Sequence, residues 1–169
     1  MGRRARSDVL EVRVDPDSYV SWPNGGGYQP VTLLVNGCDL IELVRDCELP
    51  FAEAEYDARV AEGESPESLG PRGRLAGNYL HLNGSQVFLP SHNLLGAPYP
   101  HGFGLEPEDP RNQKSLLLGC TCGITECWFL LARIQVTADV VTWDGFCQFH
   151  RSWKYDLGPL HASSAREYE

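Results

Sequence analysis

The chain has 169 residues, 42% of them hydrophobic and 22% charged, and its 14 Lys and Arg against 23 Asp and Glu give a net charge of −9. This composition is typical of a folded domain and excludes a wholly disordered chain. The negative charge argues against nucleic-acid binding, because neutralising phosphates requires clustered cations. We expect a single domain over residues 1–169, with residues 1–8 as a frayed N-terminal end.

The sequence shows no signal for export or membrane insertion. The arginine-rich start is followed by the charged segment SDVLEVRVDPD rather than by an apolar signal region. No stretch reaches the roughly 18 apolar residues of a membrane span. We therefore expect a cytoplasmic protein without a membrane partner, whose six cysteines are reduced thiols or metal ligands.

Two strands are predicted near the N-terminus. Residues 10–14 alternate in polarity, with Leu10, Val12 and Val14 on one face, which indicates a half-buried strand. The apolar run VTLLV at residues 31–35 is typical of a central strand.

A helix is predicted at about residues 39–48. Asp39 and Glu42 have the spacing of a capping box, in which each side chain bonds the backbone N–H of the other residue. The helix would bury one apolar stripe, made of Leu40, Leu43, Val44 and Cys47. Pro50 is expected to end it, because proline lacks the N–H that a helix interior needs.

The middle of the chain is rich in turn residues. Residues 53–78 predict a surface excursion, with at most a short helix over residues 51–62. Asn83 and Gly84 predict a type I′ turn joining two short strands. Residues 96–114 predict a long loop, in which His101 either faces solvent or contributes to a site.

The C-terminal third predicts the centre of an antiparallel sheet. Residues 115–120 form one strand, and residues 128–136 and 140–146 form a hairpin around Ala138 and Asp139. In this register Cys127 lies opposite His150 and Leu130 lies opposite Cys147. A short helix is expected near residues 163–169.

Three cysteines fall within the stretch LLLGCTCGITECW, which raises the question of a metal site. We predict that Cys120, Cys122, Cys127 and His150 lie close together, with Cys147 as a substitute ligand, in the tetrahedral manner of zinc. Plain packing of buried thiols is an alternative reading. A redox or catalytic role, for example through Cys147 and His150, is a third.

The segments GCTCGITECW and VVTWDGFCQFHR resemble the signature GCxCGxxxCW followed by VxWxxFxxxHR, which is found near the C-terminus in a family of small uncharacterised bacterial proteins. The segments LLVNGCDLIELVR and LPSHNLLG are similar to earlier parts of the same family. The resemblance implies a bacterial, cytosolic, single-domain protein. It implies no activity, cofactor or partner.

The sequence therefore predicts an α+β fold, with a mainly antiparallel sheet, a packed helix at 39–48 and a short C-terminal helix. For function it favours a non-enzymatic binding module with an unidentified protein or small-molecule partner, whose cysteine-rich turn holds structural zinc. The alternative is a small enzyme with a thiol- or metal-based site at the cysteines and His150.

Overall fold

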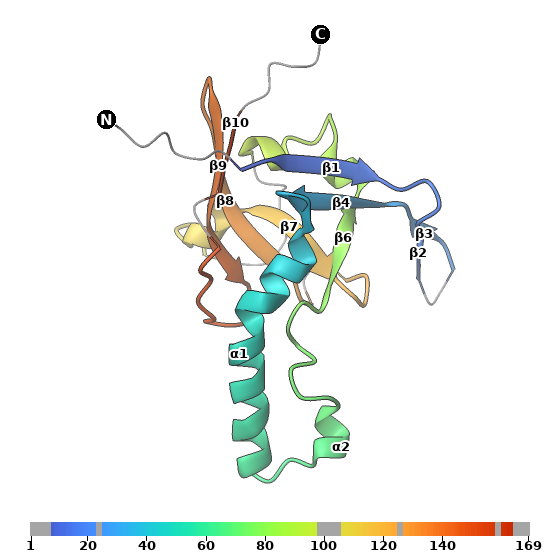
Figure 1. Ribbon diagram of the computed structural model, residues 1–169, viewed down its shortest axis with the longest axis vertical. Helices are drawn as coiled ribbons and strands as arrows, with labels where there is room; N and C mark the ends of the chain where they lie inside the picture. The colour runs from blue at the N-terminus through green and yellow to red at the C-terminus, as the bar shows by residue number, and fades with distance from the viewer. Residues whose placement is uncertain (1–7, 23–24, 98–105, 125–126, 158–159, 164–169) are drawn as a thin grey trace.

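The computed structural model describes the chain except for residues 1–7, 23–24, 98–105, 125–126, 158–159 and 164–169. An eight-stranded antiparallel sheet dominates the fold, in the order β1-β4-β6-β7-β8-β9-β10 with β5 paired to β4, while β2 and β3 form a separate pair. The strands are β1 (Leu10–Val14), β2 (Val20–Ser21), β3 (Gly27–Tyr28), β4 (Pro30–Val35), β5 (Cys38–Asp39), β6 (Tyr79–Asn83), β7 (Ser115–Cys120), β8 (Leu130–Val136), β9 (Val140–Gln148) and β10 (Leu160–Ser163). The predicted α+β class is confirmed (Figure 1).

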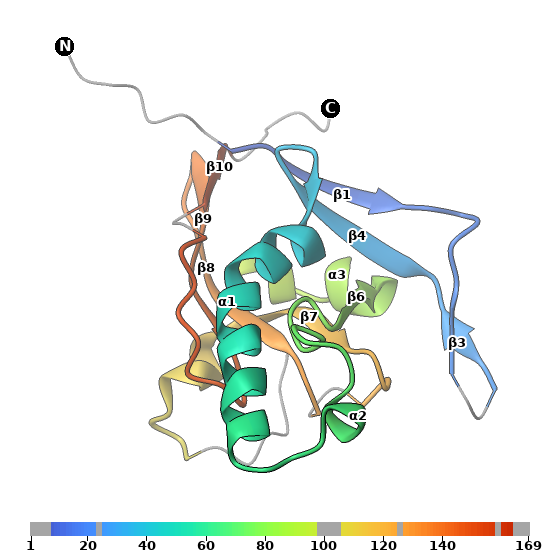
Figure 2. The ribbon, with the colours of Figure 1, turned by 60° about the horizontal axis from the view of Figure 1, so that its bottom comes forward.

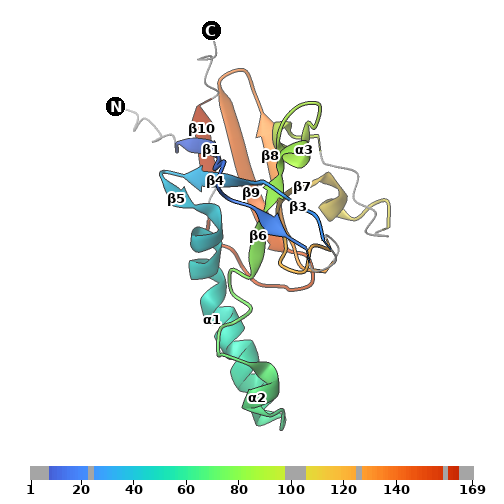
Figure 3. The same cartoon turned by 90° about the vertical axis from the view of Figure 1, so that its right-hand side faces the viewer.

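Helices cover both faces of this sheet. They are α1 (Leu40–Ala61), α2 (Pro66–Leu69) and α3 (Gly84–Val87), with 3-10 turns at Asn93–Leu95 and Pro110–Gln113. Figure 2 shows α1 in the hollow of a bent sheet, with β1 and β4 on one side and β8, β9 and β10 on the other. The far end of α1 extends past the sheet and lies beside α2 (Figure 3).

The buried side chains form two cores. The larger core includes residues from α1, β4, β7, β8 and β9, among them Leu40, Val44 and Leu130. The smaller core includes Val87 of α3 and Phe129, and Leu94 packs against it. The central position predicted for residues 31–35 is confirmed, because β4 lies between β1 and β6.

Strand β1 forms where predicted but is not half-buried. It lies at one edge of the sheet, and of its residues only Leu10 packs against the larger core. Val12 and Val14 are 43% and 41% exposed. Alternating polarity identifies a strand, but it does not reveal whether the core extends beneath it.

Helix α1 is longer than predicted. Asp39 is the N-cap, with Oδ1 accepting the Ile41 N–H at 2.8 Å, but Glu42 makes no return bond in the part of the chain that the structure describes. Pro50 lies inside the helix, which continues to Ala61, so the predicted end at Pro50 is wrong. The helix considered over residues 51–62 does form, as the second half of α1 rather than as a separate short helix. Contacts beyond the proline hold the second half, since Phe51 stacks on Trp153 at 6.4 Å between ring centroids.

The buried face of α1 also differs from the predicted stripe. Leu40 and Val44 are fully buried, whereas Leu43 and Cys47 are only partly so. Glu48 and Ala52 continue the buried face, each four residues, or about one helical turn, after the previous buried residue. The buried face thus includes a glutamate that was not part of the predicted apolar stripe.

The hairpin predicted at Asn83 and Gly84 is wrong. Asn83 ends β6 and is the N-cap of α3, and its reciprocal bonds with Gln86 form a capping box. Strand β6 pairs instead with β4 and β7, which come from distant parts of the chain. Asn is favoured both in turns and at helix N-caps. The Gln three residues later completes a capping box, and it is the residue that distinguishes a helix start from a hairpin turn here.

The C-terminal hairpin is confirmed, and its register is correct near the turn. Val136 pairs with Val141 and Arg133 with Asp144, as predicted. A bulge then adds one residue to β9, and Leu131 pairs with Cys147 and Leu130 with Gln148. The predicted pairing of Leu130 with Cys147 is therefore wrong by one residue.

Several predictions concern residues outside the described part of the chain. These are the frayed end over residues 1–7, His101, and most of the short C-terminal helix near 163–169. Before that segment, Leu160–Ser163 forms strand β10, which pairs with β9.

Candidate metal centre

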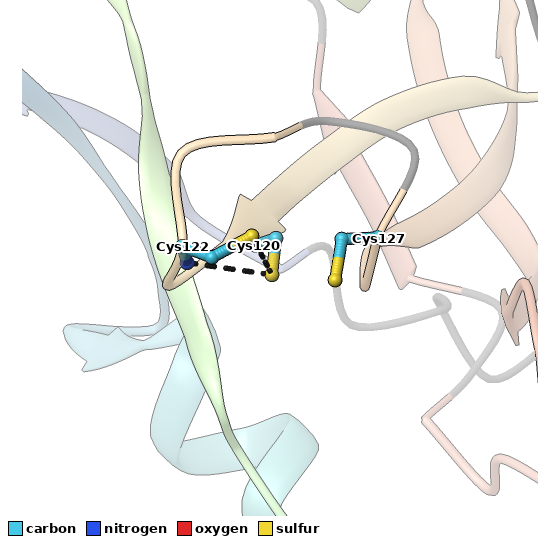
Figure 4. Close-up of side chains that lie close together, drawn as sticks. All are labelled: Cys120, Cys122 and Cys127. Carbon is cyan, nitrogen blue, oxygen red and sulfur yellow. Dashed lines mark hydrogen bonds between the residues drawn. The ribbon is translucent and has the colours of Figure 1, made fainter.

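The connection from β7 to β8 folds Cys120, Cys122 and Cys127 together. β7 ends at Cys120, and the Gly123 N–H donates to the Cys120 carbonyl at 3.0 Å. Gly123 has φ of +81°, which glycine adopts more readily than other residues. A second turn, closed by the Cys127 N–H and the Ile124 carbonyl at 3.1 Å, returns the chain toward β7. The three side chains gather below this connection (Figure 4).

The three sulfur atoms lie within 4.8 Å of one another. Cys120 Sγ and Cys122 Sγ are 3.1 Å apart, and all six cysteines are free thiols. In a tetrahedral zinc site with Zn–S bonds of about 2.3 Å, neighbouring sulfurs are about 3.8 Å apart. One observed sulfur–sulfur distance, 3.1 Å, is shorter than this, and none exceeds 4.8 Å. Small rotations of the side chains therefore suffice to surround an ion.

The surroundings of the cysteines are uneven. Cys120 is buried, whereas Cys122 and Cys127 are exposed. Burial raises the pKa of the Cys120 thiol to about 12. Desolvation acts in the same direction on Cys122, but hydrogen bonds with Cys120 and nearby backbone outweigh it and lower the pKa of Cys122. The Cys122 N–H also donates to Cys120 Sγ at 3.4 Å, a contact of the kind that orients metal-binding thiolates.

His150 does not join this group. Of the described residues, only the three cysteines form a cluster with metal-ligand spacing. The exposed His150 instead packs its ring edge-on against Phe129 and Phe149, with centroids 5.9 and 5.0 Å apart. The Phe149 N–H bonds the Phe129 carbonyl, so the predicted pairing of Cys127 with His150 is shifted by the β9 bulge.

Cys147, the predicted substitute ligand, also lies apart from the three cysteines. It packs against the smaller core, and Lys114 Nζ donates to its sulfur at 3.3 Å. Because side chains alternate across a strand, a one-residue shift exchanges the two faces of the sheet. The bulge therefore turns Cys147 away from the larger core, which contains Cys120.

A pocket of about 180 Å³ adjoins the cysteine turn, and no sequence pattern predicted it. Cys120 and Gly123 form part of its wall, together with Trp22, which directly follows β2, Tyr28 of β3 and His81 of β6. His81 Nε2 lies 3.0 Å from Asp39 Oδ2. These residues are far apart in sequence. The pairing of β6 with β7 brings His81 beside the cysteine turn, and the bond from the Tyr28 hydroxyl to the His81 carbonyl brings Tyr28 there.

A buried carboxylate was also missed. Glu48 is fully buried and accepts hydrogen bonds from Tyr79, Tyr155 and the Gly77 N–H. Its partners come from β6 and from the chain after β9, so no local pattern marks it.

Comparison of the chain with family models, curated proteins and solved structures found no match. Among the described residues, no helix combines the length and the apolar character needed to cross a bilayer.

Proposed function

We propose that the protein is a binding module that holds one thiophilic metal ion, with zinc the best match, on Cys120, Cys122 and Cys127. The observation that carries this proposal is the grouping of three sulfur atoms within 4.8 Å of one another. A cytoplasmic setting, proposed from the sequence, would keep these thiols reduced and available to a metal.

The donor set favours zinc over harder ions. Thiolates select Zn, Cu(I) and iron–sulfur clusters, whereas Mg and Ca prefer oxygen ligands. The two turns at Gly123 and Cys127 place all three donors on one short connection. A bound ion would therefore link the end of β7 to the start of β8 and stabilise the hairpin beyond it.

A second function, the small enzyme, is supported by the number of donors. Structural zinc sites are closed by protein ligands, whereas catalytic sites keep one position for water or substrate. The structure groups only three donors among the described residues, and two of them are exposed. Three protein donors leave the fourth position of a bound zinc ion open to water or substrate. A fourth ligand that exchanges with solvent would favour the enzyme, and one that does not would favour the binding module.

The test is a titration of the reduced protein with Co²⁺ followed by Zn²⁺. We expect one Co²⁺ per chain with thiolate charge-transfer absorption, and displacement by Zn²⁺. Replacing Cys120, Cys122 or Cys127 by Ser removes a ligand and should weaken binding at least about tenfold.

Cys38→Ser is the matched control, because Cys38 is exposed and lies on β5 outside the group. Cys147→Ser and His150→Ala test the ligands that the sequence predicted, and both should retain wild-type affinity. Binding that is unaffected by loss of any of the three grouped cysteines would contradict the proposal.

A further inference from the structure

The pocket beside the cysteine turn has two aromatic walls held in fixed positions. Trp22 directly follows β2 and Tyr28 is the last residue of β3, and their ring centroids are 5.7 Å apart at an interplanar angle of 53°. The Tyr28 hydroxyl donates to the His81 carbonyl at 2.8 Å, which ties this pair to β6. A Cβ on Gly123 would lie 3.0 Å from Trp22 Nε1, so the cysteine turn packs closely against the indole edge.

The floor of the pocket carries two side-chain amides whose orientation is determined by the capping box. The Gln86 N–H donates to Asn83 Oδ1 at 3.2 Å, and the Asn83 N–H donates to Gln86 Oε1 at 3.3 Å. A backbone N–H can bond only the oxygen of an amide, so both NH₂ groups are left as donors. Neither NH₂ group has a partner within the described part of the chain, and both residues line the pocket.

The pocket offers no charge to a ligand. No Lys, Arg, Asp or Glu is among its described lining residues. The His81 imidazole is already paired with Asp39, and the Tyr28 hydroxyl is used in its bond to the His81 carbonyl. Burying an anion without a counter-charge costs free energy. The two neutral NH₂ donors of the pocket therefore favour a ligand with uncharged acceptor atoms. The volume of about 180 Å³ is close to the roughly 150 Å³ of a cavity that holds one benzene, so the pocket has room for a single small ring.

We propose that this pocket binds a neutral, planar heterocycle with carbonyl acceptors, of the size of a pyrimidine base. The ring packs against the aromatic side chains of Trp22 and Tyr28, and its carbonyl oxygens accept hydrogen bonds from the amides of Asn83 and Gln86. Stacking on aromatic side chains combined with amide bonds to ring edges is how proteins recognise unpaired bases. The site is distinct from the proposed metal centre, although Cys120 borders both.

The test uses uracil as the probe, with calorimetry or ligand-observed NMR on the full chain. We expect a Kd of about 1 mM or tighter, which is within reach of a ligand this small. Asn83→Asp and Gln86→Glu keep the oxygen that the cap needs and replace the NH₂ donor by a charged carboxylate oxygen. Each should weaken uracil binding about tenfold, the effect of losing one hydrogen bond.

Leu89→Asp is the control for charge. Leu89 is 71% exposed, lies three residues after Gln86 and is not among the described lining residues of the pocket, so the variant adds the same charge and leaves both donors in place. It should bind uracil as the wild type does. Trp22→Leu should weaken binding by removing one wall, and loss of metal through Cys122→Ser should leave it unchanged.

Three results would overturn the proposal. The first is no uracil binding by the wild type at millimolar concentration. The second is equal binding by wild type, Asn83→Asp and Gln86→Glu, with the fold of both variants checked by thermal unfolding. The third is tighter binding of benzoate than of uracil, which would make the pocket an anion site.

Discussion

Glu48 shows how a single residue can hold distant parts of the chain together. Its Oε1 accepts hydrogen bonds from the hydroxyls of Tyr79 and Tyr155, each at 2.5 Å, and its Oε2 accepts the Gly77 N–H at 2.8 Å. Desolvation by burial raises the pKa of Glu48, although these three donors act in the opposite direction. Burial also raises the pKa of both tyrosines, so they remain protonated donors across the physiological range.

The raised pKa of Glu48 predicts a pH dependence of stability. The folded protein binds a proton at Glu48 more readily than the unfolded chain, whose glutamate pKa is near 4.5. The free energy of unfolding should therefore fall as the pH rises from 4.5 through the folded-state pKa of Glu48. Glu48→Gln removes this titration, so urea unfolding of the variant at several pH values should show a flatter profile in that range. Identical slopes for the two proteins would contradict the assignment.

At the scale of elements, α1 depends on contacts that outweigh its own sequence. A proline in a helix interior costs about 3 kcal/mol and leaves one carbonyl without its donor. The half of α1 after Pro50 is held by the chain that follows β9, where Arg151 pairs with Glu55 through two bonds of 2.8 and 2.9 Å. Trp153 packs in the same region between Phe51 and Trp128.

Pro50→Ala should accordingly stabilise the protein. Residue 50 is exposed, and alanine restores the N–H that bonds the carbonyl of Asp46. We expect the free energy of unfolding to rise by about 1–3 kcal/mol, less the small loss from a more flexible unfolded chain. Urea denaturation measures this directly. A less stable variant would mean that the packing of Trp153 and Arg151 needs the local distortion made by proline.

The β9 bulge is a second element-scale feature, and it separates His150 from the cysteines. Gly145 lies at the bulge with φ of +59°, and a Cβ there would meet nothing closer than Lys114 Nζ at 3.8 Å. Gly145→Ala should therefore cost about 1 kcal/mol in stability from backbone strain alone. Gly84→Ala is the control, because Gly84 has an ordinary φ and a Cβ there would lie 3.5 Å from Phe88. Equal stabilities of the two variants in urea would contradict this reading.

At the scale of the whole molecule, the sequence predicted what local patterns determine. The α+β class, the strands at 10–14, 31–35 and 115–120, and the hairpin turn all follow from polarity and turn residues. The grouping of Cys120, Cys122 and Cys127 was also predictable, because short turns limit how far they can separate.

The rest depended on contacts between distant segments. The length of α1, the burial of Glu48 and the pocket at His81 each require residues that are far apart in the chain. The position of His150 depended on one extra residue in β9, which polarity alone does not reveal.

A metal ion at the cysteines should stabilise the whole fold. Binding to the folded state alone adds about 2.7 kcal/mol to the free energy of unfolding when free zinc is 100-fold above the Kd. Thermal unfolding of the reduced protein with and without zinc should show this gain. Cys122→Ser should lose it, whereas Cys38→Ser should keep it.

The central claim is that Cys120, Cys122 and Cys127 together bind one metal ion, and X-ray absorption at the zinc edge tests it most directly. For protein loaded with one zinc per chain, we predict three sulfur neighbours at about 2.3 Å, completed by a lighter atom. Cys122→Ser, loaded in the same way, should show one sulfur fewer. A shell made of nitrogen and oxygen alone, or a spectrum that Cys122→Ser leaves unchanged, would contradict the account.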